Sequence, residues 1–270
     1  MKPINIPSVQ RTPKLVIEPL RLAKVLSGTR KIFLAIPTRD GSVHLDTTRC
    51  LLDAHIDALI RGWALDIHDS ITNPISSARN LLLAEFLASD CDDLVWIDWD
   101  IAWGKGQLME LIDYPVDFVG AVPPHRNDTG TFPVRWDSSD THIRTDPATG
   151  LIKIEGMPMA FVRIKRCAVE EMVAAYPHLE YHHPGAPNDS AWRLFSFDLI
   201  GRGEWSEDMM FCRRFREIGG EVWCDPTIQF SHIGPKRFVG SIHEYLTCKP
   251  EFDEFRDQNA AFHERLAAGT

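Results

Sequence analysis

Two carboxylates stand one residue apart in Asp98-Trp99-Asp100, directly after the apolar run Leu94-Val95-Trp96-Ile97. An ionised carboxylate in apolar surroundings is costly unless it is paired or coordinates a metal. Side chains at alternate positions of an extended chain point to the same side, about 7 Å apart, so both could reach one ion. Magnesium and manganese are typically held by one or two carboxylates together with substrate phosphates. The pair predicts a divalent-metal site for a phosphate-bearing ligand, and a strand end with two solvated carboxylates is the alternative.

A positively charged side chain lies on the apolar side of a nearby predicted helix. The helix begins at Asn73-Pro74, and its apolar stripe contains Ile75, Ala78, Leu82 and Phe86. Arg79 falls within this stripe rather than on the polar face. An inward arginine near a helix start suits bidentate binding of phosphate or carboxylate. The alternative is an arginine at the edge of the core that reaches solvent or pairs with an aspartate.

Glu207 and Asp208 open another predicted helix, over residues 206–218. Acidic residues in a first turn favour the helix dipole, which is sufficient reason for their presence. Asp208, however, shares a face with the apolar residues Phe211 and Phe215, so it is expected to point inward. An inward aspartate at a helix start could act as a general base or position an acceptor hydroxyl.

His232 follows the predicted strand 228–231 and precedes Gly234-Pro235-Lys236-Arg237. A single histidine is more often structural than a ligand, but imidazole can complete the coordination of manganese. Lys236 and Arg237 could neutralise a diphosphate.

Alternating strands and helices must position these groups. Apolar runs and helical spacing predict strands near residues 31–36, 64–68, 94–97, 117–122, 159–164, 221–224 and 228–231, and helices near 45–62, 73–89, 105–113, 168–176 and 206–218. This order favours an α/β sheet, with strand 94–97 central among parallel strands. Ligands of such sheets bind at the carboxyl ends of the strands, where Asp98 and Asp100 lie. Residues 125–150 and 177–205 show weak periodicity and are expected to be irregular.

Length and composition set the wider limits. The 270 residues suit one large domain, or one and a half small ones, and a net charge of −9 argues against a general nucleic-acid binder. None of the six cysteines forms a Cys-x-x-Cys pair, so reduced, buried thiols are expected. No apolar run approaches the roughly 20 residues that span a bilayer, and a soluble, cytoplasmic protein is expected. Residues 1–29 are predicted to form an extended arm, 30–240 the main domain and 241–270 a helical tail.

The order and spacing of these motifs resemble the GT-A glycosyltransferases, most closely the branch of Anp1-type mannosyltransferases with its bacterial and viral relatives. The matching residues are Ala78-Arg79-Asn80, Ile97-Asp98-Trp99-Asp100, Ser206-Glu207-Asp208, Asp225-Pro226 and His232-Ile233-Gly234. The resemblance implies the Rossmann-like GT-A fold, a single mixed, mostly parallel sheet flanked by helices. Its nucleotide-binding half would be residues 30–124 and its acceptor-binding half residues 125–240.

The resemblance also implies an activity, the metal-dependent transfer of a sugar from a nucleoside-diphosphate sugar (a UDP- or GDP-sugar) to a hydroxyl acceptor on a glycan, protein or small molecule. The metal would be Mn²⁺, or Mg²⁺, with the ligands Asp98, Asp100 and His232. Donor binding would fall to Pro37, Thr38, Arg39, Asp69, Arg79, Asp98, Trp99 and Lys236. Glu207 and Asp208 would be the catalytic acidic pair beside the acceptor, and the segments 125–150 and 177–205 would form the acceptor wall.

Other functions fit parts of the pattern. A sugar-nucleotide nucleotidyltransferase would need a Gly-rich basic loop after the first strand, where Pro37-Thr38-Arg39-Asp40-Gly41 supplies only one arginine. A haloacid-dehalogenase-like phosphatase carries its Asp-x-Asp after the first strand, not the third. A non-catalytic nucleotide-sugar-binding domain would not need the complete set Asp98, Asp100, Asp208 and His232.

Overall fold

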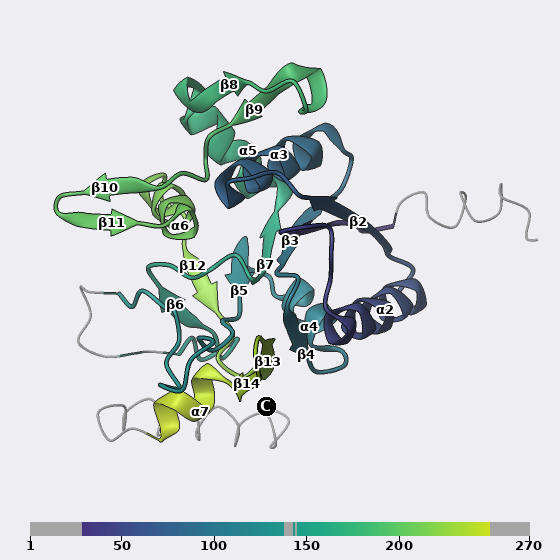
Figure 1. Cartoon of the computed structure of the whole chain (residues 1–270), viewed down its shortest axis with the longest axis vertical. Coiled ribbons are helices and arrows are strands. Elements are labelled where there is room, and N and C mark those ends of the chain that lie inside the picture. The colour runs from purple at the N-terminus through teal and green to yellow at the C-terminus, as the bar shows by residue number, and fades with distance from the viewer. Residues whose placement is uncertain (1–28, 138–142, 144, 249–270) are drawn as a thin grey trace, which may run out of the picture.

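The computed structural model describes residues 29–137, 143 and 145–248. The arm predicted for residues 1–29 lies outside this range except for its last residue, and so does the part of the predicted tail 241–270 that follows residue 248. The described chain is an α/β protein built on one seven-stranded sheet with helices on both faces (Figure 1). No helix in the described residues combines the length and apolarity that crossing a membrane requires.

The main sheet has the strand order β2-β1-β3-β7-β5-β12-β6. Its strands are β1 (Lys31–Pro37), β2 (Ala64–Ser70), β3 (Asp93–Ile97), β5 (Phe118–Gly120), β6 (Ile152–Ile154), β7 (Phe161–Lys165) and β12 (Val222–Cys224). β2, β1 and β3 pair in parallel, as do β5 and β12, whereas β7 is antiparallel to both β3 and β5 and β6 is antiparallel to β12. The expectation that β3 lies among parallel strands is therefore wrong on one side. β3 is central and fully buried, but its second neighbour runs in the opposite direction.

Helices cover the two faces of this sheet. They are α2 (Leu45–Ile60), α3 (Ile75–Ala88), α4 (Gln107–Asp113), α5 (Arg166–Ala175), α6 (Glu207–Glu217) and the short α7 (Ile242–Thr247). α2 and α4 pack on one face, and α3, α5 and α6 on the other. The α3 cap differs from expectation because Pro74, not Asn73, is the N-cap residue and the helix begins at Ile75.

Small sheets extend from this frame. β4 (Ile101–Trp103), β13 (Phe230–Ile233) and β14 (Arg237–Gly240) form a three-stranded antiparallel sheet in the order β14-β13-β4. Two hairpins, β8 (Glu180–His182) with β9 (Ser190–Trp192) and β10 (Asp198–Ile200) with β11 (Gly203–Trp205), fill much of the region expected to be irregular. The short 3-10 turns η1 (Pro177–Leu179) and η2 (Pro187–Asp189) flank β8 and β9.

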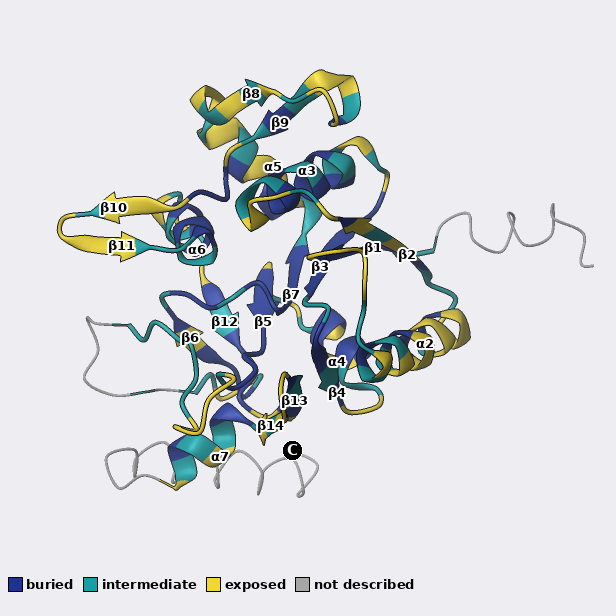
Figure 2. Ribbon diagram, viewed as in Figure 1, coloured by how far each residue is buried: buried dark blue, intermediate teal, exposed yellow. Residues whose placement is uncertain are grey.

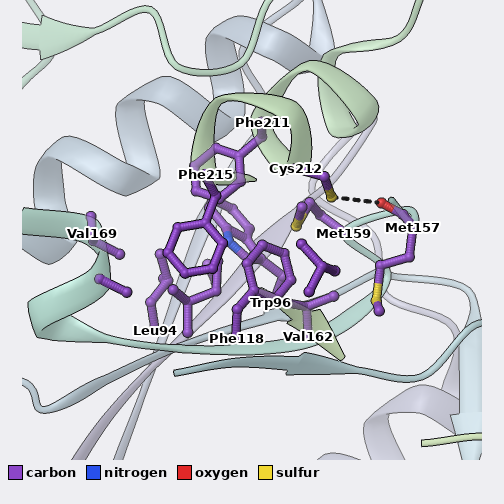
Figure 3. Close-up of a cluster of buried hydrophobic side chains, with 14 of the residues drawn as sticks. Leu94, Trp96, Phe118, Met157, Met159, Val162, Val169, Phe211, Cys212 and Phe215 are labelled. Carbon is purple, nitrogen blue, oxygen red and sulfur yellow. Dashed lines mark hydrogen bonds between the residues drawn. The ribbon is translucent and has the colours of Figure 1, made fainter. Parts of the chain in front are cut away.

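The core beneath α6 is aromatic. Trp96 of β3 and Phe118 of β5 lie under Phe211 and Phe215 of α6, and the Cys212 Sγ donates to the Met157 carbonyl at 3.6 Å (Figure 3). Each of these four aromatic side chains is at most 3% exposed. Burial of a large side chain contributes about 1.5–3 kcal/mol. This packing fixes α6 against the sheet and thereby fixes the position of the acidic residues at its first turn.

All six cysteines are free thiols. Cys91, Cys212 and Cys224 are buried as expected, whereas Cys167 and Cys248 are exposed. Cys167 lies at the start of α5 and Cys248 directly after α7, and Cys50 is half-buried.

Candidate active site

A cavity of about 250 Å³ opens where the parallel strands β1, β2 and β3 end. It is lined by Pro37, Thr38, Arg39, Thr72, Asn73, Ile75, Ala78 and Trp99. These residues end β1, follow β1, β2 or β3, or lie in the first turn of α3, so the cavity lies at the carboxyl edge of the parallel strands. This is the edge at which open α/β sheets bind ligands.

The loop after β1 is held in place by local hydrogen bonds. The Thr38 amide donates to the Ser70 carbonyl at 2.9 Å, and the Thr38 Oγ1 accepts from the Gly41 amide at 3.1 Å. Gly41 has φ of +80°, a backbone conformation that suits glycine in a tight turn. The His44 amide donates to the Trp99 carbonyl at 2.9 Å, which joins this loop to the Asp-x-Asp turn. The mouth of the cavity is thus a connected backbone frame.

Four of the predicted donor-binding residues line this cavity, namely Pro37, Thr38, Arg39 and Trp99. Asp69 and Lys236 do not. Asp69 is an exposed residue of β2. Lys236 follows β13 and pairs with the exposed Asp128. Thr72 and Asn73 are also wall residues, although Asn73 was predicted only as part of a helix start and Thr72 was given no role. Their position directly after the second predicted strand was the available signal.

Asp100 is a buried carboxylate with two partners. Its side chain is 5% exposed, its Oδ2 lies 2.6 Å from Arg126 Nη1, and its Oδ1 lies 3.5 Å from His232 Nε2. The small sheet creates this arrangement, because β4 follows Asp100 directly and pairs with β13, placing His232 opposite Ile101. His232 therefore lies within β13, not after it as expected from the sequence.

Arg126 was not anticipated from the sequence. It belongs to the stretch 125–150, whose weak periodicity gave no indication of what its side chains would contact. Two links tie its loop to β13 and β14: His232 Nδ1 to the Pro124 carbonyl at 2.7 Å, and Lys236 to Asp128. Gly234 leaves room for the arginine, since a Cβ there would lie 3.2 Å from Arg126 Cδ.

The Asp100–His232 pair has the chemistry of a partial metal site. A carbonyl only accepts hydrogen bonds, so His232 Nδ1 donates to Pro124, and Nε2 is directed at Asp100. A histidine that ligates a metal through one ring nitrogen usually donates a hydrogen bond from the other to a carbonyl or carboxylate, which orients the ring. The described residues contain no group of three or more His, Cys, Asp or Glu placed to hold a metal. A cation at this pair would therefore need further oxygen ligands, which substrate phosphates supply.

Asp98 belongs to a second cluster around Arg79. The Arg79 guanidinium is 2% exposed; Nη2 lies 3.4 Å from Asp98 Oδ1, and Nη1 lies 3.0 Å from Glu207 Oε1 and contacts Asp208. The alternative reading of Arg79, pairing with an aspartate, is thus present in the structure. One buried cation joins the carboxylate after β3 to the acidic pair that opens α6.

The two clusters influence each other electrostatically. Burial raises the pKa of Asp98; the Arg79 cation opposes this, and the negative charge of Asp100 adds to it. His232 and Glu207 also act on the same carboxyl. The site is therefore one continuous charged array, in which four carboxylates share two arginines and one histidine.

Asn80 secures the wall behind Arg79. Its amide nitrogen donates to the Phe195 carbonyl at 2.9 Å, and its amide oxygen accepts from the Phe195 amide at 2.9 Å. The Phe195 ring stacks on Phe211 with centroids 4.4 Å apart. This contact joins α3 to α6 and keeps Arg79 of α3 next to Glu207 of α6.

Comparisons with known proteins give little further assignment. No family model and no curated protein matches the chain. Among solved structures, A197 from STIV is similar over 80% of this chain and 91% of its own, at 19% identity and a TM-score of 0.46. HddC from Yersinia pseudotuberculosis is similar over 56% and 64%, at 11% identity and a TM-score of 0.26. With TM-scores at this level, functional inference depends on the geometry of the site.

Proposed function

We propose that the protein is a glycosyltransferase of the GT-A type, which transfers a sugar from a nucleoside-diphosphate sugar to a hydroxyl acceptor. One observation carries the proposal. A cavity of about 250 Å³ at the ends of β1 to β3 adjoins, through Trp99, two carboxylates that are backed by an inward acidic pair. This is the arrangement expected if a nucleoside, its diphosphate and an acceptor hydroxyl are to be held in a row.

In this proposal the cavity holds the nucleoside. Pro37, Thr38 and Arg39 form one wall, and the Trp99 side chain borders the side nearest the carboxylates. The diphosphate would then lie toward Asp100 and His232. Arg126 offers a guanidinium at the same place, where it could bind phosphate oxygens once it leaves Asp100.

The residues proposed to hold a divalent cation are Asp100 and His232, with Asp98 close by. Mn²⁺ or Mg²⁺ would neutralise the charge that builds on the departing nucleoside diphosphate. The protein's own contribution is to keep the Asp100 carboxylate buried and oriented and to direct His232 Nε2 toward it.

Asp208 is the proposed catalytic base. Its side chain is 14% exposed, against 7% for Glu207, and both contact Arg79. A carboxylate at this position can accept a hydrogen bond or a proton from an acceptor hydroxyl. Glu207 accepts a hydrogen bond from Arg79 and thereby helps to hold Arg79 beside Asp208.

The test measures release of nucleoside diphosphate from a panel of UDP- and GDP-sugars with Mn²⁺, using the full chain. We expect Asp100→Asn and Asp208→Asn each to lower turnover by about 10²–10⁴-fold. Asp208→Asn should retain nucleoside-diphosphate binding, because it does not line the cavity. A suitable control is Asp53→Asn, an exposed residue of α2.

Wild-type turnover in both site variants would overturn the proposal. Binding of nucleoside diphosphate without release from any donor would indicate a binding domain. Pyrophosphate formed from a nucleoside triphosphate and a sugar phosphate would indicate a nucleotidyltransferase.

A further inference from the structure

One flank of the molecule exposes an unusual amount of large apolar surface. Eight of the eleven large apolar side chains that are exposed in the described chain come from α2, β2, the connection after β2 and the start of α3. They are Leu45, Leu52, Ile56, Leu59, Ile60, Ile67, Ile71 and Ile75. Figure 2 shows the outer side of α2 as largely exposed. Scattered apolar residues are normal on a surface, but a contiguous group marks an interaction site.

The exposed residues of α2 share one stripe. Leu45, Leu52, Ile56 and Leu59 recur at spacings of seven, four and three residues, on the side opposite the buried Leu51, Ala54 and Ala58. A surface helix ordinarily carries polar residues there. Arg49, which is 67% exposed and pairs with Asp46, lies in the same stripe between Leu45 and Leu52. Apart from this residue α2 has two apolar faces, of which the described residues cover one.

A further exposed apolar side chain lies at the edge of the sheet. β2 is the terminal strand of the main sheet, and Ile67 is 47% exposed. Ile67 lies two residues after Leu65, which packs in the same core cluster as α2, so it points to the α2 side of the sheet. We call the α2 stripe and Ile67 together the flank; Ile67 belongs to the terminal strand β2.

The chain enters the described fold next to this flank. The Arg30 carbonyl accepts from the Ala64 amide at 3.0 Å, and the Arg30 guanidinium lies 5.1 Å from the Trp63 ring. Both contacts are at the turn between α2 and β2. A segment that precedes residue 29 is thus attached to the fold at one end of the α2 stripe. The stripe is about 22 Å long at 1.5 Å per residue.

The sequence before this point complements the flank. Residues 14–26 read KLVIEPLRLAKVL, with eight apolar residues, three basic residues and one acidic residue. The flank is bordered by the exposed carboxylates of Asp53 and Asp69. Thirteen residues span about 20 Å as a helix and up to about 45 Å extended, so in either form the segment can reach along the stripe.

We propose that residues 14–26 dock on the flank, covering the α2 stripe and Ile67 and shielding the open edge of β2. The proposed contact is intramolecular and apolar, and the segment carries basic residues that can complement the carboxylates beside the flank. It makes residues 14–26 a part of the folded domain. Its function is to remove from solvent an apolar surface and a strand edge that would otherwise promote association. The proposal does not depend on the enzymatic activity.

The test compares hydrogen exchange in full-length proteins. In the wild type we expect protection in peptides from residues 14–26 and from α2. Leu22→Glu with Leu26→Glu should speed exchange in α2 by about fivefold or more. Leu52→Glu with Ile56→Glu, both exposed in the described fold, should in turn remove the protection of residues 14–26. Ile4→Glu with Ile6→Glu serves as the matched control and should change neither region.

Three outcomes would overturn the proposal. The first is α2 exchange unaffected by the Leu22 and Leu26 substitutions. The second is protection that increases with protein concentration together with a dimer mass in light scattering, because a second copy would then cover the flank. The third is protection of residues 14–26 only in the presence of anionic lipid vesicles, because a membrane surface would then be their partner.

Discussion

At the scale of single residues, Arg126 is the group that most changes how the site is understood. Its Nη1 lies 2.6 Å from Asp100 Oδ2. A metal cation bound to Asp100 would need the same oxygen as a ligand. Asp100 is buried, so it needs a positive partner at all times. Arg126, 46% exposed on a loop, can provide that partner when no other cation is bound and can move aside when one is.

We therefore expect Arg126→Ala to bind Mn²⁺ about threefold to fivefold more tightly than the wild type. The arginine of the removed ion pair is 46% exposed, and ion pairs that solvent reaches contribute at most about 1 kcal/mol. Free Mn²⁺ measured by electron paramagnetic resonance checks this without any turnover. Arg126→Lys keeps the charge and should stay near the wild-type value. Weaker Mn²⁺ binding in Arg126→Ala would mean that the arginine supports the metal instead of competing with it.

At the scale of elements, short strands do much of the positioning. β4 and β13 have three and four residues, yet their pairing is what brings His232 beside Asp100. Strands this short carry almost no periodic signal, and β4 was not predicted. The longer helix α6 was predicted, because its apolar face repeats with helical spacing and Gly219-Gly220 ends it.

The contact between α3 and the segment before α6 offers a direct test at this scale. Asn80→Ala would leave the Phe195 amide and carbonyl, both buried, without their partners. Each unsatisfied buried group costs about 1–3 kcal/mol, so we expect a loss of about 2–4 kcal/mol in the free energy of unfolding. Urea unfolding followed by fluorescence measures this loss. Ser76→Ala, one turn earlier on α3 and only partly buried, is the control and should change stability by less than about 1 kcal/mol. A loss below about 1 kcal/mol in Asn80→Ala would contradict the role given to this contact.

At the scale of the whole molecule, the buried core makes stability depend on pH in the alkaline range. Burial raises the pKa of the Cys212 thiol from 9.0 to about 12. Below pH 9 the thiol is protonated in both states, and its contribution is fully present. As the pH rises above 9, the unfolded chain ionises first, so the stability contribution of Cys212 is lost progressively up to about pH 12.

We expect the free energy of unfolding to fall by about 2 kcal/mol between pH 9 and pH 10.5, from Cys212 alone. Urea unfolding under reducing conditions at several pH values gives the slope. Cys212→Ala should flatten it, while Cys167→Ala, which removes an exposed thiol, should not. An unchanged slope in Cys212→Ala would show that other groups, such as the buried Cys224 thiol and Tyr114, dominate the alkaline loss.

The alternating apolar runs were sufficient to predict an α/β protein with most of its long elements. The runs 31–36 and 94–97 are buried strands, and 45–62 and 206–218 are helical, because local periodicity reports directly which face of an element is buried. Asp98, Asp100, Arg79 and Asp208 could be singled out for a related reason. A charged residue at an apolar position is visible in the sequence before any fold is known.

Which of these groups meet depended on contacts between distant segments. Arg79 lies 128 residues from Glu207, and Arg126 lies 26 residues from Asp100 in a stretch without periodicity. The reversed direction of β7 and the pairing of β4 with β13 were also set at this level. The chemistry of a side chain is local, so the sequence indicates which residues can bind a phosphate, a cation or a proton. Their partners are decided by packing, because only the folded chain determines which buried charges are close enough to neutralise one another.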